Sequence, residues 1–120
     1  MNRTRMSTAL LASVLAVGIF GVVASASSGM TPRQATLAAC KKERGRFIPL
    51  PGIREVTPAG MSAFRPGWCT FVAYPAAIIV QVRATRTAPC RFRVRIEEAW
   101  PNELSARIST RRATCRSLRR

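Results

Sequence analysis

Four cysteines in a short and strongly basic chain are the feature that most restricts how this sequence can fold. They are Cys40, Cys69, Cys90 and Cys115. An even number of cysteines in a small exported domain is typical of a disulfide framework. Zinc binding and free thiols are the alternatives, but the chain has no histidine and no C-x-x-C pair to hold zinc. We therefore expect two disulfides and no metal site.

The first 26 residues have the pattern of a secretory signal peptide. Arg3 and Arg5 form a short positive region, and no charged residue follows them up to Ala26. The small residues Ala-Ser-Ala that end at Ala26 suit signal peptidase and predict cleavage there. A retained membrane anchor is the alternative, since an apolar segment of about 20 residues can span a bilayer. The sequence predicts a signal peptide over 1–26, one domain over 27–120, and a secreted or periplasmic protein.

Hydrophobic residues alone are a weak basis for folding this domain. The chain of 120 residues has 20 Lys and Arg against 5 acidic residues, which gives a formal charge of +15. In residues 27–120 only about 20% of the residues are Leu, Ile, Val or Phe, and a highly charged chain of this composition lies close to the boundary at which chains stay disordered. Two disulfides that close loops of about 25–30 residues contribute roughly 3 kcal/mol each on the chain-entropy model. We therefore expect the fold to depend on them.

One helix is expected at the start of the domain. Thr31, Pro32 and Gln34 combine a capping box with proline at the first helical position. Gly45 can adopt the left-handed backbone conformation that commonly ends a helix, which predicts a helix over 32–44. Its apolar face is small, so it should pack closely against a sheet.

The segment 46–67 is too rich in proline and glycine for a long regular element. Met61 and Phe64 within it either cover the core or form an exposed binding loop. Alternation of apolar and polar residues follows and predicts strands at 68–74, 77–86, 90–96 and 104–109, the last with a helix as the alternative. The predicted fold class is α+β, with an N-terminal helix packed on a four-stranded antiparallel meander.

The last hairpin predicts how the cysteines pair. Inward residues must face inward residues across two strands, which favours a register with Ile96 opposite Ile108. Carried further, this register brings Cys90 next to Cys115. We therefore favour the pairs Cys90–Cys115 and Cys40–Cys69, and the two other pairings stay open.

Arginines on the outward side of this hairpin are the candidate binding residues. Alternate positions of the strand 90–96 carry three of them, and the next strand adds two in the same register. Like charges that face each other across strands repel, unless an anion shares the site. Guanidinium groups suit phosphates and carboxylates. The predicted site is Arg91, Arg93, Arg95, Arg107 and Arg111, and a merely solvated face that blocks aggregation is the alternative.

Composition argues against catalysis and for an anionic partner. The chain has neither histidine nor aspartate, and Glu97 and Glu98 are neighbours in a predicted strand, so they point to opposite faces. We expect no enzyme activity and no cofactor. The partner could be a lipid phosphate, an anionic glycan or an acidic protein. Nucleic acid is not favoured because few aromatic residues accompany the arginines, and membrane contact is expected only if the signal is uncleaved.

Three functions are compatible with this composition. The first is a small exported module that binds an anionic envelope or extracellular ligand. The second is an interaction subunit of an envelope assembly that keeps its N-terminal segment as an anchor. The third is a cationic antimicrobial or toxin-like protein.

N-terminal sequencing of the exported protein tests the predicted signal peptide. We expect the mature chain to begin at Ser27, because cleavage follows Ala26. Protein recovered from the periplasm or the medium with Met1 intact would contradict cleavage.

Overall fold

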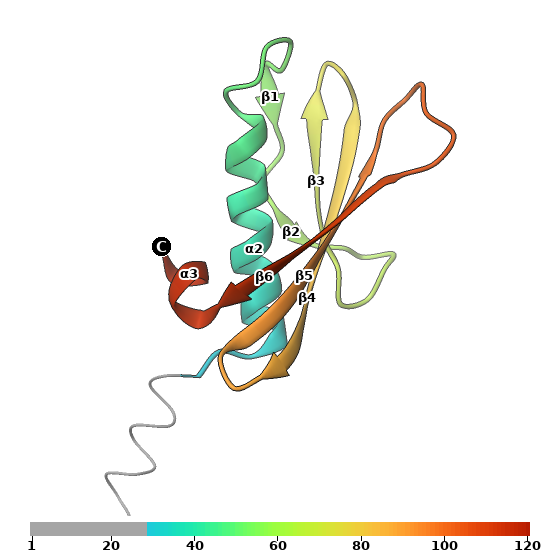
Figure 1. Cartoon of the computed structure of the whole chain (residues 1–120). Coiled ribbons are helices and arrows are strands. Elements are labelled where there is room, and N and C mark those ends of the chain that lie inside the picture. Colours follow the sequence, from blue (N-terminus) through green and yellow to red (C-terminus); the bar gives the residue numbers. More distant parts are fainter. Residues whose placement is uncertain (1–28) are drawn as a thin grey trace, which may run out of the picture.

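The computed structural model describes residues 29–120, and the predicted signal peptide lies outside the described residues. Its elements are α2 (Pro32–Phe47), β1 (Glu55–Val56), β2 (Gly60–Met61), β3 (Cys69–Tyr74), β4 (Ile78–Ala88), β5 (Arg91–Ala99), β6 (Arg107–Thr114) and α3 (Cys115–Arg119). The strands form one antiparallel sheet in the order β1-β3-β4-β5-β6, with β2 also paired to β3. The fold is α+β with α2 lying across the sheet (Figure 1). The prediction of four strands was too low, because two short strands form in the Pro- and Gly-rich segment.

Helix α2 begins where the sequence predicts and ends later. The Thr31 Oγ1 atom accepts a hydrogen bond from the Gln34 backbone N–H at 3.1 Å, and the Thr31 N–H donates to Gln34 Oε1 at 2.8 Å. The helix then continues through Gly45 to Phe47. Phe47 is buried edge-on to Phe71, with 5.6 Å between ring centroids. The added turn therefore buries an aromatic ring, and this outweighs the preference of Gly45 for a helix end.

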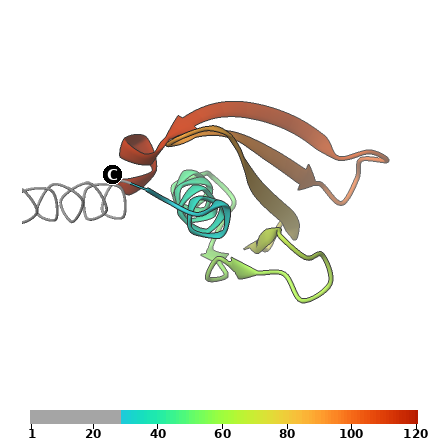
Figure 2. The same ribbon diagram turned by 90° about the horizontal axis from the view of Figure 1, so that it is seen from below.

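The sheet curves around α2, so that its inner face and the helix enclose the core (Figure 2). Ala35 and Ala39 face the sheet from the helix, and their small side chains allow a close approach. Thr36 Oγ1 accepts a hydrogen bond from the Ala84 backbone N–H at 3.0 Å. A helix side chain thereby satisfies a backbone donor of β4 beyond the last residue that pairs with β3. The strands contribute Phe71, Ile78, Val80, Val82, Phe92, Val94 and Ile96 to the core.

Strands β4 and β5 follow the predicted alternation. Their even-numbered residues up to Ala84 and from Phe92 to Ile96 are buried, and most of the odd-numbered ones are exposed. Cys90 was predicted to begin the strand but lies in the turn before it, with φ at 55°. The two strands therefore present one apolar face to α2 and one polar face to solvent.

Strand β6 differs most from the prediction. It spans Arg107–Thr114 instead of 104–109, and neither a strand nor a helix forms immediately after Trp100. Its register pairs Ile96 with Ser109 and so is shifted by one residue from the predicted one. The prediction required Ile108 to face the core, but this side chain is 54% exposed. Because β6 has almost no buried face, apolar patterning does not determine its register.

The disulfides join Cys40 to Cys69 and Cys90 to Cys115, which are the pairs favoured from the sequence. The first ties α2 to β3 in the interior, where both cysteines are fully buried. The second ties the β4–β5 turn to the start of α3. The one-residue shift in register leaves this pairing intact, because the Cys115 backbone N–H donates to the Cys90 carbonyl at 3.1 Å.

Met61 and Phe64, which the sequence predicts to share one role, lie in different environments at the β2–β3 connection. Met61 is partly buried against the core, whereas Phe64 is 98% exposed at the loop. Met61 therefore covers the core, and Phe64 does not contribute to it.

Reduction of both disulfides should unfold the domain at moderate temperature. The bridges close segments with sequence separations of 29 and 25. Each contributes roughly 3 kcal/mol, against a total stability of about 5–10 kcal/mol for a small domain. Thermal melts with and without reductant measure the effect, and equal midpoints would contradict a structural role for the cysteines.

Candidate functional site

The outer face of the sheet, turned away from α2, gathers exposed arginines from three neighbouring strands. We call this group the arginine face. Alternate residues of β4, β5 and β6 share it, because side chains of a strand alternate between faces and the strand registers align them. Its members are Arg83, Arg91, Arg93, Arg95 and Arg112, all exposed.

Two pairs of these arginines stand directly opposite each other across strands. Arg83 of β4 faces Arg95 of β5, and Arg93 of β5 faces Arg112 of β6. Such pairs are destabilising when nothing neutralises them. Within residues 29–120, only Arg95 of this set forms an ion pair. The face is therefore a concentration of positive charge with four arginines available for an external anion.

Threonine hydroxyls lie between the arginines. Thr85 is paired with Arg93, and Thr110 is paired with Arg95, on the same outer face. Both threonines are exposed. A hydroxyl can donate a hydrogen bond to an anion that a guanidinium group holds. The face thus combines charge with neutral donors on the outer side of the curved sheet (Figure 2).

One end of the arginine face is closed by a network around Glu97. Arg65 Nη1 and Arg95 Nε each lie 2.8 Å from a carboxylate oxygen of Glu97. Arg65 also stacks on Trp68, with its guanidinium carbon 3.6 Å from the ring centroid. Hydrogen bonds from Arg65 and then Arg95 lower the pKa of Glu97 below its ordinary value of 4.5. This carboxylate is therefore ionised at neutral pH and fixes two arginine side chains.

Two of the five predicted site residues do not belong to the arginine face. Arg107 and Arg111 occupy odd positions of β6, whereas Arg112 occupies an even one. The observed register therefore turns Arg107 and Arg111 toward the side of α2. Arg111 Nη2 lies 3.4 Å from the buried carboxylate of Glu43. Arg107 pairs with Glu103, and Arg107 Nε donates to Glu103 Oε1 at 3.0 Å. The one-residue register shift is the reason for the difference.

The other three predicted residues, Arg91, Arg93 and Arg95, lie together on β5 as the alternation indicated. Sequence reasoning missed Arg83 and Arg112. Arg83 was on the polar side of the predicted strand 77–86, so the signal for it was present. Arg112 could be found only with the correct register of β6.

Chemistry at other positions is limited in the described part of the chain. Glu97 and Glu98 lie on opposite faces of β5. Residues 29–120 contain no group of three Cys, Asp or Glu placed to hold a metal ion. No helix in this part of the chain is long and apolar enough to cross a membrane.

Comparisons of the chain with protein-family models, curated proteins and solved structures gave no match. The arguments about this site therefore rest on its own geometry and charge.

Replacement of Glu97 by Gln should remove a pH-dependent part of the stability. The folded-state pKa is lowered, so the stabilisation is complete above about the ordinary value of 4.5 and is lost as pH falls through the folded-state pKa. We expect E97Q to cost about 1 kcal/mol at neutral pH and to match the wild type in strong acid. Urea unfolding across this pH range measures the difference.

Glu55→Gln is the matched control, since Glu55 is exposed and forms no ion pair among the described residues. Its effect on the unfolding free energy should be small at every pH. A cost of E97Q that persists unchanged in strong acid would show that packing, and not the ion pairs, is responsible.

Proposed function

We propose that this chain is a small exported, non-enzymatic module that binds a polyanion through the arginine face. The observation that carries the proposal is the direct opposition of Arg93 to Arg112, neither of which forms an ion pair among residues 29–120, next to Arg83 on the neighbouring strand. Repulsion across this pair is removed when an anionic group lies between the two guanidinium groups. Phosphate and carboxylate groups of an envelope lipid or glycan have the required chemistry.

The distribution of the few acidic residues supports this proposal. Glu43, Glu97 and Glu103 are engaged in ion pairs away from the open part of the arginine face. Of the arginine face, only Arg95, at the Glu97 end, forms an ion pair with an acidic residue among residues 29–120. A ligand would therefore meet positive charge that the acidic residues of the described chain leave uncompensated.

The tryptophans argue against single-stranded nucleic acid as the ligand. Arg65 covers Trp68, and the Arg107 guanidinium carbon lies 4.0 Å from the centroid of the Trp100 ring. Bases bind single-strand sites by stacking on open aromatic faces. Each tryptophan has one ring face already occupied by arginine, which favours lipid or glycan anions over bases.

Two disulfides within so small a domain support an oxidising compartment. The predicted signal peptide supports export by the same reasoning. Together they support an envelope or extracellular ligand for the arginine face.

Binding to heparin, used as a generic polyanion, tests the proposal. The variant R83Q/R91Q/R93Q removes three exposed arginines of the face that form no ion pair among residues 29–120. We expect weaker binding and a salt dependence flattened by about 2–3 in the log–log slope between about 50 and 200 mM salt. The melting temperature should stay equal or rise slightly, because like-charge repulsion is reduced.

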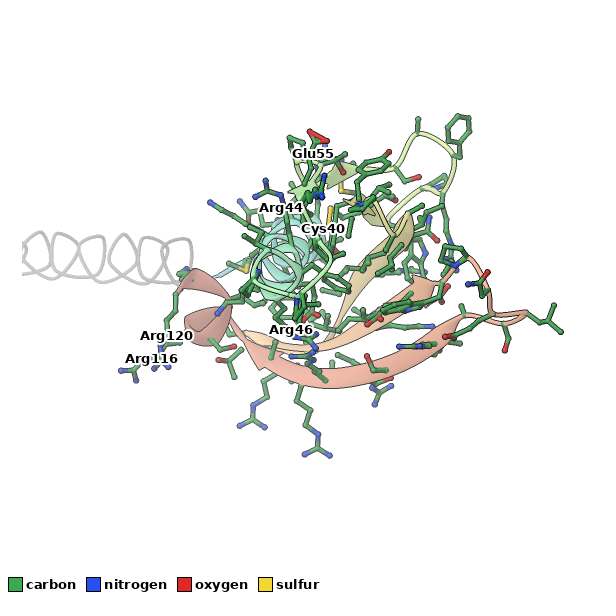
Figure 3. The ribbon with its side chains drawn as sticks, turned by 90° about the horizontal axis from the view of Figure 1, so that it is seen from above. Cys40, Arg44, Arg46, Glu55, Arg116 and Arg120 are labelled. Atoms are coloured by element: carbon green, nitrogen blue, oxygen red, sulfur yellow. A yellow bond between two sulfur atoms is a disulfide. The ribbon has the colours of Figure 1, made fainter. Side chains whose placement is uncertain are left out.

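The matched control is R54Q/R116Q/R120Q, which removes the same charge from exposed positions elsewhere. Arg116 and Arg120 project from the C-terminal end of the chain, away from the outer face of the sheet (Figure 3). The control should retain most of the affinity. Equal losses in the two triple variants would show that only net charge matters and would overturn the assignment of the site.

A further inference from the structure

Strand β6 forms a free edge of the sheet. It is the last strand in the sheet order, and β5 is its only strand partner within residues 29–120. Alternate backbone groups of an antiparallel edge strand point away from its partner. Alternate residues of β6 (Arg107–Thr114) thus offer a row of donors and acceptors to another extended chain.

A groove of about 410 Å³ lies beside this edge, between β6, α2 and α3. Three consecutive residues of β6, numbers 111–113, line one wall of the groove. Its floor is apolar and its rim is basic. The floor consists of Ala39, Val94, Ala113 and Leu118, and the rim carries Lys42, Arg46, Arg111 and Arg112.

Among residues 29–120, Glu43 is the one acidic residue that lines the groove, and its charge is already matched. Its side chain is only 6% exposed and forms ion pairs with Arg46 and Arg111. Figure 3 shows Arg46 between α2 and the sheet. Lys42 and Arg112 form no ion pair among the described residues, so the mouth of the groove keeps a net positive charge.

The charge of the edge decides what kind of chain can add to it. Strand β6 carries three arginines and no acidic residue. Two copies of β6 would therefore bring arginines together, which opposes self-association. An acidic segment has the complementary charge, and alternate apolar side chains of the same segment would reach the floor of the groove.

We propose that the β6 edge binds an extended acidic segment of another protein as an additional strand of the sheet. Backbone hydrogen bonds supply the alignment, as in other cases of strand addition. One side chain face of the segment places an apolar residue in the groove, and the other face places carboxylates near Arg112. The inference goes beyond the proposed function, because it adds backbone pairing at the β6 edge. The two sites share Arg112, but Lys42 lines only the groove, and Arg83, Arg91 and Arg93 belong only to the arginine face.

The test uses a fluorescent eight-residue peptide of alternating glutamate and valine with the full domain. Fluorescence anisotropy at physiological ionic strength gives the affinity. Two further peptides carry N-methyl groups at either the odd or the even backbone nitrogens. Strand addition uses one edge of the peptide, so we expect at least one methylated version to bind more than about tenfold more weakly.

Lys42→Glu and Lys41→Glu provide the matched pair of protein variants. Both lysines are exposed neighbours on α2, but only Lys42 lines the groove. We expect K42E to weaken peptide binding about tenfold and K41E to change it less than about twofold. Heparin binding should be alike in both variants, which separates this inference from the arginine face.

Equal effects of K42E and K41E, or full affinity of both methylated peptides, would overturn the proposal and indicate nonspecific attraction. Absence of binding by the unmodified peptide would overturn it as well. A loss of heparin binding in R83Q/R91Q/R93Q with unchanged peptide binding would support both sites independently.

Discussion

The close packing of α2 against the concave face of the sheet is the contact on which the other features depend. Alanines at the interface let the helix approach, and the Cys40–Cys69 disulfide fixes it to β3. This arrangement covers one face of β4 and β5 and leaves the other face to solvent. The arginine face exists because the sheet has a single covered side. The groove exists because α2 extends beneath the last strand.

The small number of acidic residues makes the surface strongly basic. A buried or partly buried carboxylate requires cationic partners, and this chain supplies two arginines each to Glu43 and Glu97. These pairs are internal to the fold and fix side chains near α2 and near Trp68. Arg107 pairs with Glu103, and the members of the arginine face other than Arg95 form no ion pair among residues 29–120. The outer face of the sheet therefore keeps an excess of positive charge.

Sequence reasoning predicted those parts of the fold in which burial determines structure. The helix start at Thr31 follows from local hydrogen bonding, and the faces of β4 and β5 follow from alternation around a buried side. Strand β6 lacks a buried side, so Ile108 and Leu104 gave a misleading pattern; both are exposed. The candidate site inherited this uncertainty, since Arg111 and Arg112 exchange faces when the register moves by one residue.

The end of α2 illustrates the same limit. Gly45 is a local signal for a helix end, whereas the burial of Phe47 against Phe71 is a tertiary interaction that the sequence does not display. The short strands β1 and β2 likewise depend on the free edge of β3, which offers them partners. Strands that pair with a single neighbouring strand, such as β1 and β2, are therefore the elements hardest to predict from the sequence.

The order of the two disulfides along the chain has a consequence for oxidation during synthesis. Each cysteine is bonded to a neighbour in sequence, and the two closed segments do not overlap. In a chain that emerges from its N-terminus, Cys40 and Cys69 become available before Cys90 and Cys115 appear. The first pairing that can form is then the native one among three alternatives. Oxidation while the chain emerges would therefore favour the native connectivity kinetically.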